Sequence, residues 1–497
     1  MNIVFIALDT QRADHLGCYG YGRDTSPAID ALARQGTVFD NAWSVTSWTL
    51  PAHVSMLTGL PVSAHAQCDW DLPATQSVES HRPRGRFISE ELSNAGYDTA
   101  GFYSCLYLEP KFGFGAGFDT WERAYHSVQS EPLFAERWSA ARKVGDADTL
   151  RSIFAENPSL FDSEARSAPV AVDGALRWLD KREPNSAPFF LFLHIYDLHS
   201  PYTPPVPFDT QFDPDYRGTI DGRKLGDVDS PVHPGMNPRD LEHVVALYDG
   251  EIAGVDRELA RLFGALERSG IAKDTLVILT SDHGEEFFEH GGKQHGGDLY
   301  RETLQVPLIV KWPGRIPSNL HRKATVSLID LAPSLRAAAA LPPDRALPGI
   351  NLLALAGSAK APEPRQLIAE LTLRRGVDEP LWMDALIDER QQTIVQRAGA
   401  EGWSAERFDL LDDPRERAPA LRIDAATPEA SEVLDQLDHA RRELHRLRAI
   451  ARLRVHVGAD IQASERDELS ALGYGGGAKR TTFGVERLCF DGCIWRP

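Results

Sequence analysis

Short apolar runs, each followed by a polar loop or a helical segment, recur along the chain up to about residue 350. They include NIVFIAL at residues 2–8, PFFLFLHIYD ending at Asp197, TLVILTSDHG and VPLIVKWPG. Runs of this length without polar alternation are typical of strands buried on both faces of a parallel sheet.

Segments with a helical spacing of apolar residues lie between these runs. SPAIDALARQG has Ser26 as a candidate N-cap and Gly36 as a candidate C-cap. The long segment VVALYDGEIAGVDRELARLFGALERSG comes directly before a predicted strand. Because strands and helices alternate, the sequence predicts an α/β fold with a mostly parallel sheet flanked by helices.

The composition changes after Gly357, where LAGSAKAPEPRQ is typical of a linker. Residues 366–411 alternate short strand-like runs with turns, and residues 427–456 have the spacing and composition of one long helix. We therefore expect a main domain over residues 1–357 and a smaller C-terminal α+β subdomain over residues 366–456. The Gly-rich residues 473–497 are expected to be a disordered tail.

The charge and the cysteines narrow the class of protein. A formal net charge of -19 is unfavourable for nucleic-acid binding, which needs clustered Lys and Arg. Five scattered cysteines do not suggest a disulfide framework and fit a reducing compartment. The N-terminus MNIVFIALDT has no signal-peptide pattern, and no run of about 18 apolar residues occurs. We expect a cytoplasmic protein without a membrane span.

Residues of metal-binding type follow three of the predicted strands: Asp9, Asp197, His199, Asp282 and His283. In an open α/β sheet, ligands bind outside the carboxyl ends of the strands, so these side chains are candidates for one site. Thr49 lies where the loop SWTLPAHVSMLTG enters a helix. Taken singly, Asp9 and Thr49 are better interpreted as helix caps, and Asp282 and His283 as capping or hydrogen-bonding residues.

Six sequence motifs favour a functional role for these residues, because the motifs occur together in one chain and in the same order. LDTQRADHLGCYGY, SPAIDALARQGTVFDNAWS, SWTLPAHVSMLTG, YDGEIAGVDREL, TLVILTSDHGEEFFEHG and LYRETLQVPLIVKWPG closely resemble phrases of the sulfatase family, within the alkaline-phosphatase superfamily. The resemblance covers about residues 1–350, and DLLDDPRER is similar to part of that family's C-terminal subdomain. It implies a sulfatase-like catalytic domain that hydrolyses esters with the help of a divalent cation.

The resemblance also implies a metal site. One divalent cation would be held by Asp9, Asp282, His283 and the nucleophile Thr49, with Thr10 standing where many sulfatases have a second acidic residue. This mixed set of oxygen and nitrogen ligands suits Ca, Mg, Mn or Zn, so the identity of the metal stays open. A second metal, held by Asp197 with His199, is the less favoured alternative.

The nucleophile departs from the family pattern. Sulfatases have a Cys or Ser, oxidised to formylglycine, in a Cys-x-Pro-x-Arg pattern, and the matching window here is Thr49-Leu50-Pro51-Ala52-His53. Thr cannot give the same aldehyde, and His53 replaces the Arg. Thr49 instead resembles the unmodified Thr nucleophile of phosphoethanolamine transferases, lipoteichoic acid synthases and nucleotide pyrophosphatases in the same superfamily.

The remaining candidates are assigned by the same resemblance. His199 matches a histidine that contacts the transferring group, as a hydrogen-bond donor or as the acid for the leaving oxygen, and Asp197 would orient it. His295 lies near the position of a sulfatase lysine, with Lys293 as its competitor for that role. His53 would support the Thr49 loop or contact the substrate.

We therefore expect a hydrolase of small-molecule sulfate or phosphate esters in which Thr49 is the metal-activated nucleophile. Phosphate esters, and diesters in particular, are favoured as substrates because water can attack a phospho-Thr at phosphorus. A sulfo-Thr cannot release sulfate by elimination from a hemiacetal, as the sulfated formylglycine of sulfatases does. A phosphotransferase of the same superfamily and a noncatalytic binding module on this fold are the alternatives. The substrate and the oligomeric state stay open.

Overall fold

The computed structural model describes residues 1–65, 85–124, 166–183, 186–223, 225, 230–345, 347–358, 363–373, 381–398, 402–424 and 426–450. The predicted tail at 473–497 lies outside the described residues. No helix in the described ranges has the length and apolar composition needed to cross a membrane.

An eight-stranded sheet forms the centre of the described structure, in the order β10-β2-β9-β6-β1-β5-β3-β4. The strand bounds are β1 Asn2–Leu8, β2 Thr37–Trp43, β3 Asp98–Tyr103, β4 Thr120–Arg123, β5 Phe189–Ile195, β6 Thr275–Ser281, β9 Leu308–Lys311 and β10 Leu320–Ser327. Neighbouring strands are parallel except at β9, which runs antiparallel to β2 and β6. The expected α/β fold with a mostly parallel sheet is confirmed.

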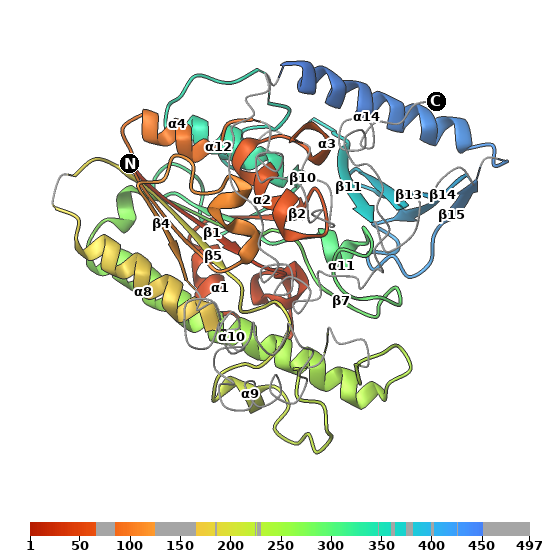
Figure 1. Cartoon of the computed structure of the whole chain (residues 1–497), viewed down its shortest axis with the longest axis horizontal. Helices are drawn as coiled ribbons and strands as arrows, with labels where there is room; N and C mark the ends of the chain where they lie inside the picture. Colours follow the sequence, from red (N-terminus) through yellow and green to blue (C-terminus); the bar gives the residue numbers. More distant parts are fainter. Residues whose placement is uncertain are drawn as a thin grey trace, which may run out of the picture.

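Helices cover both faces of this sheet (Figure 1). One face holds α1 Pro27–Arg34, α8 Ser167–Asp180 and α10 Pro238–Arg268, and the other holds α2 Thr49–Thr58, α4 Ile88–Asn94 and α12 Leu331–Ala338. Shorter helices are α3 Val62–His65, α9 Phe208–Gln211, α11 Arg301–Leu304 and α13 Leu352–Gly357. Single 3₁₀ turns are η1 Ala13–His15, η2 Gly17–Tyr19, η4 Leu106–Leu108, η5 Pro110–Phe112, η8 Ala272–Asp274 and η9 Leu328–Asp330.

The helix boundaries follow the sequence signals closely but not always by the expected chemistry. Ser26 is at the N-cap position of α1, yet its side chain makes no capping hydrogen bond. Its hydroxyl instead accepts from the Gly17 amide at 3.0 Å. The predicted C-cap Gly36 lies one residue beyond the observed cap, Gln35. At Gly36 a Cβ atom would meet the Val310 carbonyl oxygen at 2.4 Å, so close packing against β9 requires glycine.

The central strands divide their side chains between two apolar layers. In β1, Ile3, Phe5 and Ala7 face the layer that contains α2, whereas Val4, Ile6 and Leu8 face α1, α8 and α10. This alternation is the two-residue period of a strand, and it explains why the sequence shows an unbroken apolar run. Every side chain from Ile3 to Leu8 is fully buried.

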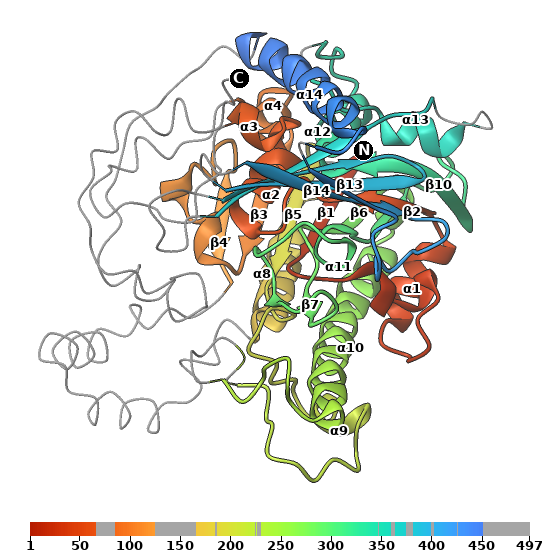
Figure 2. The same cartoon turned by 90° about the vertical axis from the view of Figure 1, so that its right-hand side faces the viewer.

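A second sheet, antiparallel and five-stranded, follows in the C-terminal part (Figure 2). Its strands are β11 Leu367–Leu373, β12 Leu381–Ile387, β13 Gln391–Ala398, β14 Trp403–Asp409 and β15 Leu421–Asp424. The helix α14, Ala430–Ile450, packs Val433 and Leu437 against one face of this sheet. The other face belongs to the same apolar cluster as α2 and α12, so the second sheet extends the main core.

Polar contacts also join the two sheets. The Glu370 amide of β11 donates to the Val45 carbonyl at 2.8 Å, and the Ser63 amide donates to Glu370 Oε2 at 3.0 Å. Beside the small hairpin of β7, Glu286–Phe287, and β8, Lys293–Gln294, His290 contacts both α11 and the loop between β14 and β15. Its Nδ1 lies 2.5 Å from Glu302 Oε1, and its Nε2 donates to the Glu416 carbonyl at 2.8 Å.

Candidate active site

The site is built where β1, β5 and β6 end side by side. In the register of these parallel strands, Leu8 lies opposite both Ile195 and Ser281. The residues that follow, Asp9 and Asp282, are therefore neighbours across the strand ends, and the Asp9 amide donates to the Ile195 carbonyl at 2.9 Å. This placement at the carboxyl edge of the sheet was expected from the sequence.

The alternation of the strands decides which side chains face α2. Residues 5 and 7 of β1, 190 and 192 of β5, and 276 and 278 of β6 all belong to the α2 layer. Asp9, His194 and Asp282 are separated from these residues by an even number of positions, so their side chains lie on the same face of the sheet. All three side chains are fully buried, and they face the start of α2.

Thr49 is the first residue of α2, and Trp48 is at the N-cap position. The interpretation of Thr49 as an N-cap hydroxyl is therefore wrong. Its Oγ1 lies 3.4 Å from Asp9 Oδ2 and 3.3 Å from His283 Nε2. The structure thus brings Thr49, Asp9 and His283 together, although they come from distant parts of the chain.

Asp9, Asp282 and His283 form one group of possible metal ligands, with donor atoms all within 4.8 Å of one another. His283 Nε2 lies 3.8 Å from Asp9 Oδ1 and 3.4 Å from Asp282 Oδ2. Its Nδ1 is 2.9 Å from the Gly284 carbonyl oxygen, and a hydrogen bond donated there leaves the lone pair on Nε2. This is the usual arrangement of a histidine ligand, in which the distal ring nitrogen is fixed by a backbone oxygen.

The electrostatics of this group also fit a cation. Asp9 Oδ1 and Asp282 Oδ2 are buried without a hydrogen-bond partner. Burial raises the pKa of Asp9 to about 7, and burial together with the charge of Asp9 raises the pKa of Asp282. Two buried carboxylates with unpaired oxygens are costly unless a positive charge compensates them, so the residues fit a divalent cation.

Thr10, which stands where many sulfatases have a second acidic residue, helps to position Asp282. Its amide donates to Asp282 Oδ1 at 3.2 Å, and the His283 amide donates to the same oxygen at 2.9 Å. Thr10 adopts a positive φ of 54°, which is uncommon for a β-branched residue. These two donors hold Asp282 Oδ1, so Oδ2 is turned toward the cluster.

His199 and His295 lie beside the metal-type group. The His295 ring centroid is 4.4 Å from that of His283 and 4.8 Å from that of His199. Burial, reinforced by the neighbouring imidazoles, lowers the pKa of both His199 and His295 well below the ordinary value. Both rings are therefore neutral in the protein without substrate.

Two residues of the site were missed by the sequence reasoning. Glu285 Oε1 lies 2.9 Å from His295 Nδ1, and its Oε2 accepts from the Tyr202 hydroxyl at 2.8 Å. Burial raises the pKa of Glu285 to about 8. The other is His194, whose Nε2 is 3.2 Å from Asp9 Oδ2. The alternation of β5 would have identified His194, whereas no comparable signal marks Glu285.

His53 lies one turn into α2, where its imidazole packs against Asp282 and His194. Its Nδ1 is 2.9 Å from the Thr49 carbonyl oxygen and 3.6 Å from Asp282 Oδ2. Burial, with a smaller effect of His194, lowers the pKa of His53 to about 3. The imidazole is therefore neutral and lies against the carboxylate of Asp282.

The other two substrate candidates are placed differently. Asp197 Oδ2 accepts from the amides of Ser167 and Ala168, both at 2.9 Å, and from the Ser167 hydroxyl, so it holds the start of α8. The structure thus offers no support for Asp197 as a metal ligand with His199. Lys293 Nζ donates to the Val232 carbonyl at 3.0 Å.

Comparisons with known proteins show the family of this chain and the proteins that share its fold. A family model described as Sulfatase matches residues 1–341. An arylsulfatase of Clostridium perfringens is 24% identical over 458 residues, covering 84% of this chain and 89% of its own length. A multifunctional alkaline phosphatase superfamily protein of Trinickia caryophylli is 24% identical over 365 residues, covering 63% of this chain and 68% of its own length. A solved phosphonate monoester hydrolase of Agrobacterium radiobacter has the same fold, with a TM-score of 0.63, 22% identity and coverage of 90% and 96%.

Proposed function

This chain belongs to the sulfatase family and is an ester hydrolase of that family, and we propose that unmodified Thr49 is its nucleophile. The observation that carries the proposal is the position of the Thr49 hydroxyl. It is fully buried and lies 3.4 Å from Asp9 Oδ2 and 3.3 Å from His283 Nε2. A hydroxyl held against both a carboxylate and an imidazole is oriented for deprotonation and attack.

Asp9, Asp282, His283 and the Thr49 oxygen would hold the divalent cation of this site. When bound, that cation lowers the pKa of the hydroxyl and neutralises charge on the transferring group. Thr49 lies at the N-terminus of α2, where the helix dipole also favours a developing negative charge. The family resemblance and the local electrostatics thus support the same role for Thr49.

The reaction proceeds in two steps. The Thr49 hydroxyl gives up its proton to solvent, its oxygen bonds to phosphorus as the bond from phosphorus to the ester oxygen breaks, and the departing oxygen takes up a proton. Water then attacks the phosphorus of phospho-Thr49, its oxygen stays on phosphorus and one of its hydrogens passes to the Thr49 oxygen, so that phosphate or a phosphate monoester leaves and the hydroxyl is restored. His199 and His295 are placed to donate a proton once the charge of a bound anion has raised their low pKa.

The same chemistry favours phosphate esters over sulfate esters. A phospho-Thr is cleaved by water at phosphorus, but a sulfo-Thr offers no aldehyde hydrate through which the group is eliminated. Because residue 49 is Thr, the protein has no side chain there from which formylglycine forms. We therefore propose phosphate diesters and monoesters as the substrate class.

A substrate panel tests this function. The purified protein, loaded in turn with Ca²⁺, Mg²⁺, Mn²⁺ or Zn²⁺, is assayed with an aryl sulfate, a phosphate monoester, a phosphodiester and a phosphonate monoester. The highest kcat/KM is expected for a phosphorus ester. A clear preference for the aryl sulfate would contradict the proposed substrate class, and absence of turnover with every substrate would contradict hydrolysis of these esters.

A further inference from the structure

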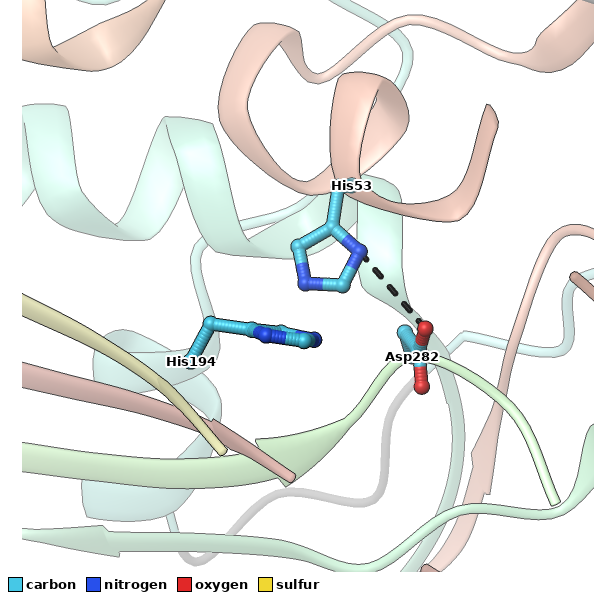
Figure 3. Close-up of side chains that lie close together, drawn as sticks. All are labelled: His53, His194 and Asp282. Carbon is cyan, nitrogen blue, oxygen red and sulfur yellow. Dashed lines mark ion pairs between the residues drawn. The ribbon is translucent and has the colours of Figure 1, made fainter. Parts of the chain in front are cut away.

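Three residues on the α2 side of the site form a second group of possible metal ligands: His53, His194 and Asp282. They come from α2, β5 and the loop after β6, and their donor atoms all lie within 4.8 Å of one another. Figure 3 shows the two imidazoles and the carboxylate turned toward a common space. All three side chains are 0% exposed, so solvent does not reach this space through them.

Each of the three side chains has a buried polar atom without a hydrogen-bond partner. These atoms are Nε2 of His53, Nε2 of His194 and Oδ2 of Asp282. Leaving a buried polar atom without a partner is costly, so three such atoms in one small space indicate a ligand that satisfies them together.

The hydrogen bonds on the other ring nitrogens show what kind of ligand fits. His53 Nδ1 donates to the Thr49 carbonyl oxygen at 2.9 Å. His194 Nδ1 lies 3.4 Å from Ser104 Oγ, whose own hydrogen is donated to the His194 carbonyl oxygen, so that the hydroxyl accepts from the ring. Both histidines therefore present an unprotonated Nε2, and these lone pairs require an electron-pair acceptor.

A cation is that acceptor, because the third member of the group is a carboxylate. A neutral polar molecule would need two hydrogens for the imidazoles, and it would leave the charge of Asp282 buried. Two imidazole nitrogens and one carboxylate oxygen are ligands typical of Zn²⁺, whereas Ca²⁺ and Mg²⁺ prefer oxygen ligands throughout.

The second group shares its carboxylate with the first. Asp282 Oδ2 lies 3.6 Å from His53 Nδ1 on one side and 3.4 Å from His283 Nε2 on the other. Asp9 also reaches both groups, with Oδ1 3.8 Å from His283 Nε2 and Oδ2 3.2 Å from His194 Nε2. Two carboxylates thus lie between imidazoles on both sides, as in sites that hold two cations about 3.5–4 Å apart.

We propose that His53, His194 and Asp282 bind a second divalent cation of the Zn²⁺ or Mn²⁺ type, next to the cation held by Asp9, Asp282 and His283. The proposal rests on the proposed function only for the first cation. It replaces the expectation that a second metal would use Asp197 and His199, and it gives His53 the role of a ligand.

Metal stoichiometry tests the second site without any need for turnover. The full chain is stripped with a chelator, reloaded with Zn²⁺ or with Mn²⁺, freed of excess ion, and analysed by mass spectrometry of the metal. The wild type is expected to hold two ions per chain, and His53→Gln and His194→Gln are each expected to hold one. Circular dichroism and the thermal midpoint confirm that each variant is folded.

His65→Gln is the matched control. His65 is another fully buried histidine near the same helix, and its Nε2 lies 3.0 Å from Ser55 Oγ. Because it lies in neither group of possible ligands, this variant is expected to keep two ions. Retention of two ions by His53→Gln and His194→Gln, or loss of one by His65→Gln, would overturn the assignment.

A spectroscopic measurement on the wild type covers the case in which a variant does not fold. Two Mn²⁺ ions that share Asp282 are expected to give an exchange-coupled electron paramagnetic resonance signal. A wild type that saturates at one ion with an uncoupled signal would overturn the second site. The proposed function then stands or fails separately, because Thr49→Ala decides it at either stoichiometry.

Discussion

Nε2 of His194 lies 3.2 Å from Oδ2 of Asp9, although the two residues are far apart along the chain. The contact exists because β1 and β5 are parallel neighbours, with His194 opposite Ala7 in the register. The strand register thus places an imidazole against Oδ2 of a buried carboxylate whose other oxygen, Oδ1, has no hydrogen-bond partner.

Substitution of the shared carboxylate should remove both cations. Asp282→Ala deletes Oδ2, the atom that faces His53 and His283, and is expected to lower the metal content below one ion per chain. We expect kcat/KM to fall by about 10²–10³-fold or more, because charge stabilisation at the reacting group is lost. Metal analysis and steady-state kinetics check both effects. An Asp282→Ala protein that keeps its full metal content would contradict the ligand assignment.

Removal of the Thr49 hydroxyl should stop the reaction while the protein stays folded. Thr49→Ala is expected to lower kcat by about 10³-fold or more, as for other nucleophile deletions, and Thr49→Ser should retain part of the rate. Intact-protein mass spectrometry should find unmodified Thr at position 49. A Thr49→Ala variant with near-native turnover would show that water attacks directly.

Asp197→Ala should affect stability rather than metal binding. Its carboxylate accepts from the amides of Ser167 and Ala168, so we expect a loss of about 1–2 kcal/mol in the free energy of unfolding. Metal content is expected to stay at the wild-type value. Urea denaturation and metal analysis give the two readouts, and loss of a cation in this variant would support the less favoured interpretation of Asp197 as a ligand of a second metal.

His290 should stabilise the protein in a pH-dependent way. Burial opposes its charge, but the hydrogen bond and charge of Glu302 raise the pKa of His290 to about 9. A raised pKa means that this stabilisation is fully present below about pH 6.5 and is lost as the pH rises through 9. His290→Ala is therefore expected to lower the free energy of unfolding by about 2 kcal/mol at pH 6 and by much less at pH 9.5.

Urea denaturation of the wild type and His290→Ala at the two pH values provides the test. His321→Ala is the control, since His321 is an exposed partner of Asp40 and should matter by less than about 0.5 kcal/mol. An equal effect of His290→Ala at pH 6 and pH 9.5 would mean that the His290–Glu302 pair is not charged in the folded protein.

Much of the fold and part of the site could be predicted from the sequence. Apolar runs of strand length fixed β1, β5 and β6, and the polar residues that end β1 and β6 gave Asp9, Asp282 and His283. Thr49 was found from the motif around it, since its hydroxyl lies near Asp9 only after α2 packs on the sheet.

What the sequence did not show has physical reasons. Asp197 follows β5 as Asp9 follows β1, but the sequence did not show that α8 begins beside it and takes its carboxylate. His194 lies inside an apolar run, where a lone histidine does not stand out, yet its two-residue spacing from Phe192 places it on the α2 face. Glu285 is one of several acidic residues in a loop, and only the folded chain brings it to His295.

The hydrogen bond from the Glu370 amide to the Val45 carbonyl has a consequence for how the enzyme loses activity when it unfolds. Val45 is four residues before Thr49, so strand β11 is fastened to the segment that leads into α2. The five-stranded sheet also shares an apolar cluster with that helix. Opening of the C-terminal sheet would therefore expose apolar surface and release the nucleophile in the same event, so the two regions should unfold as a single cooperative unit.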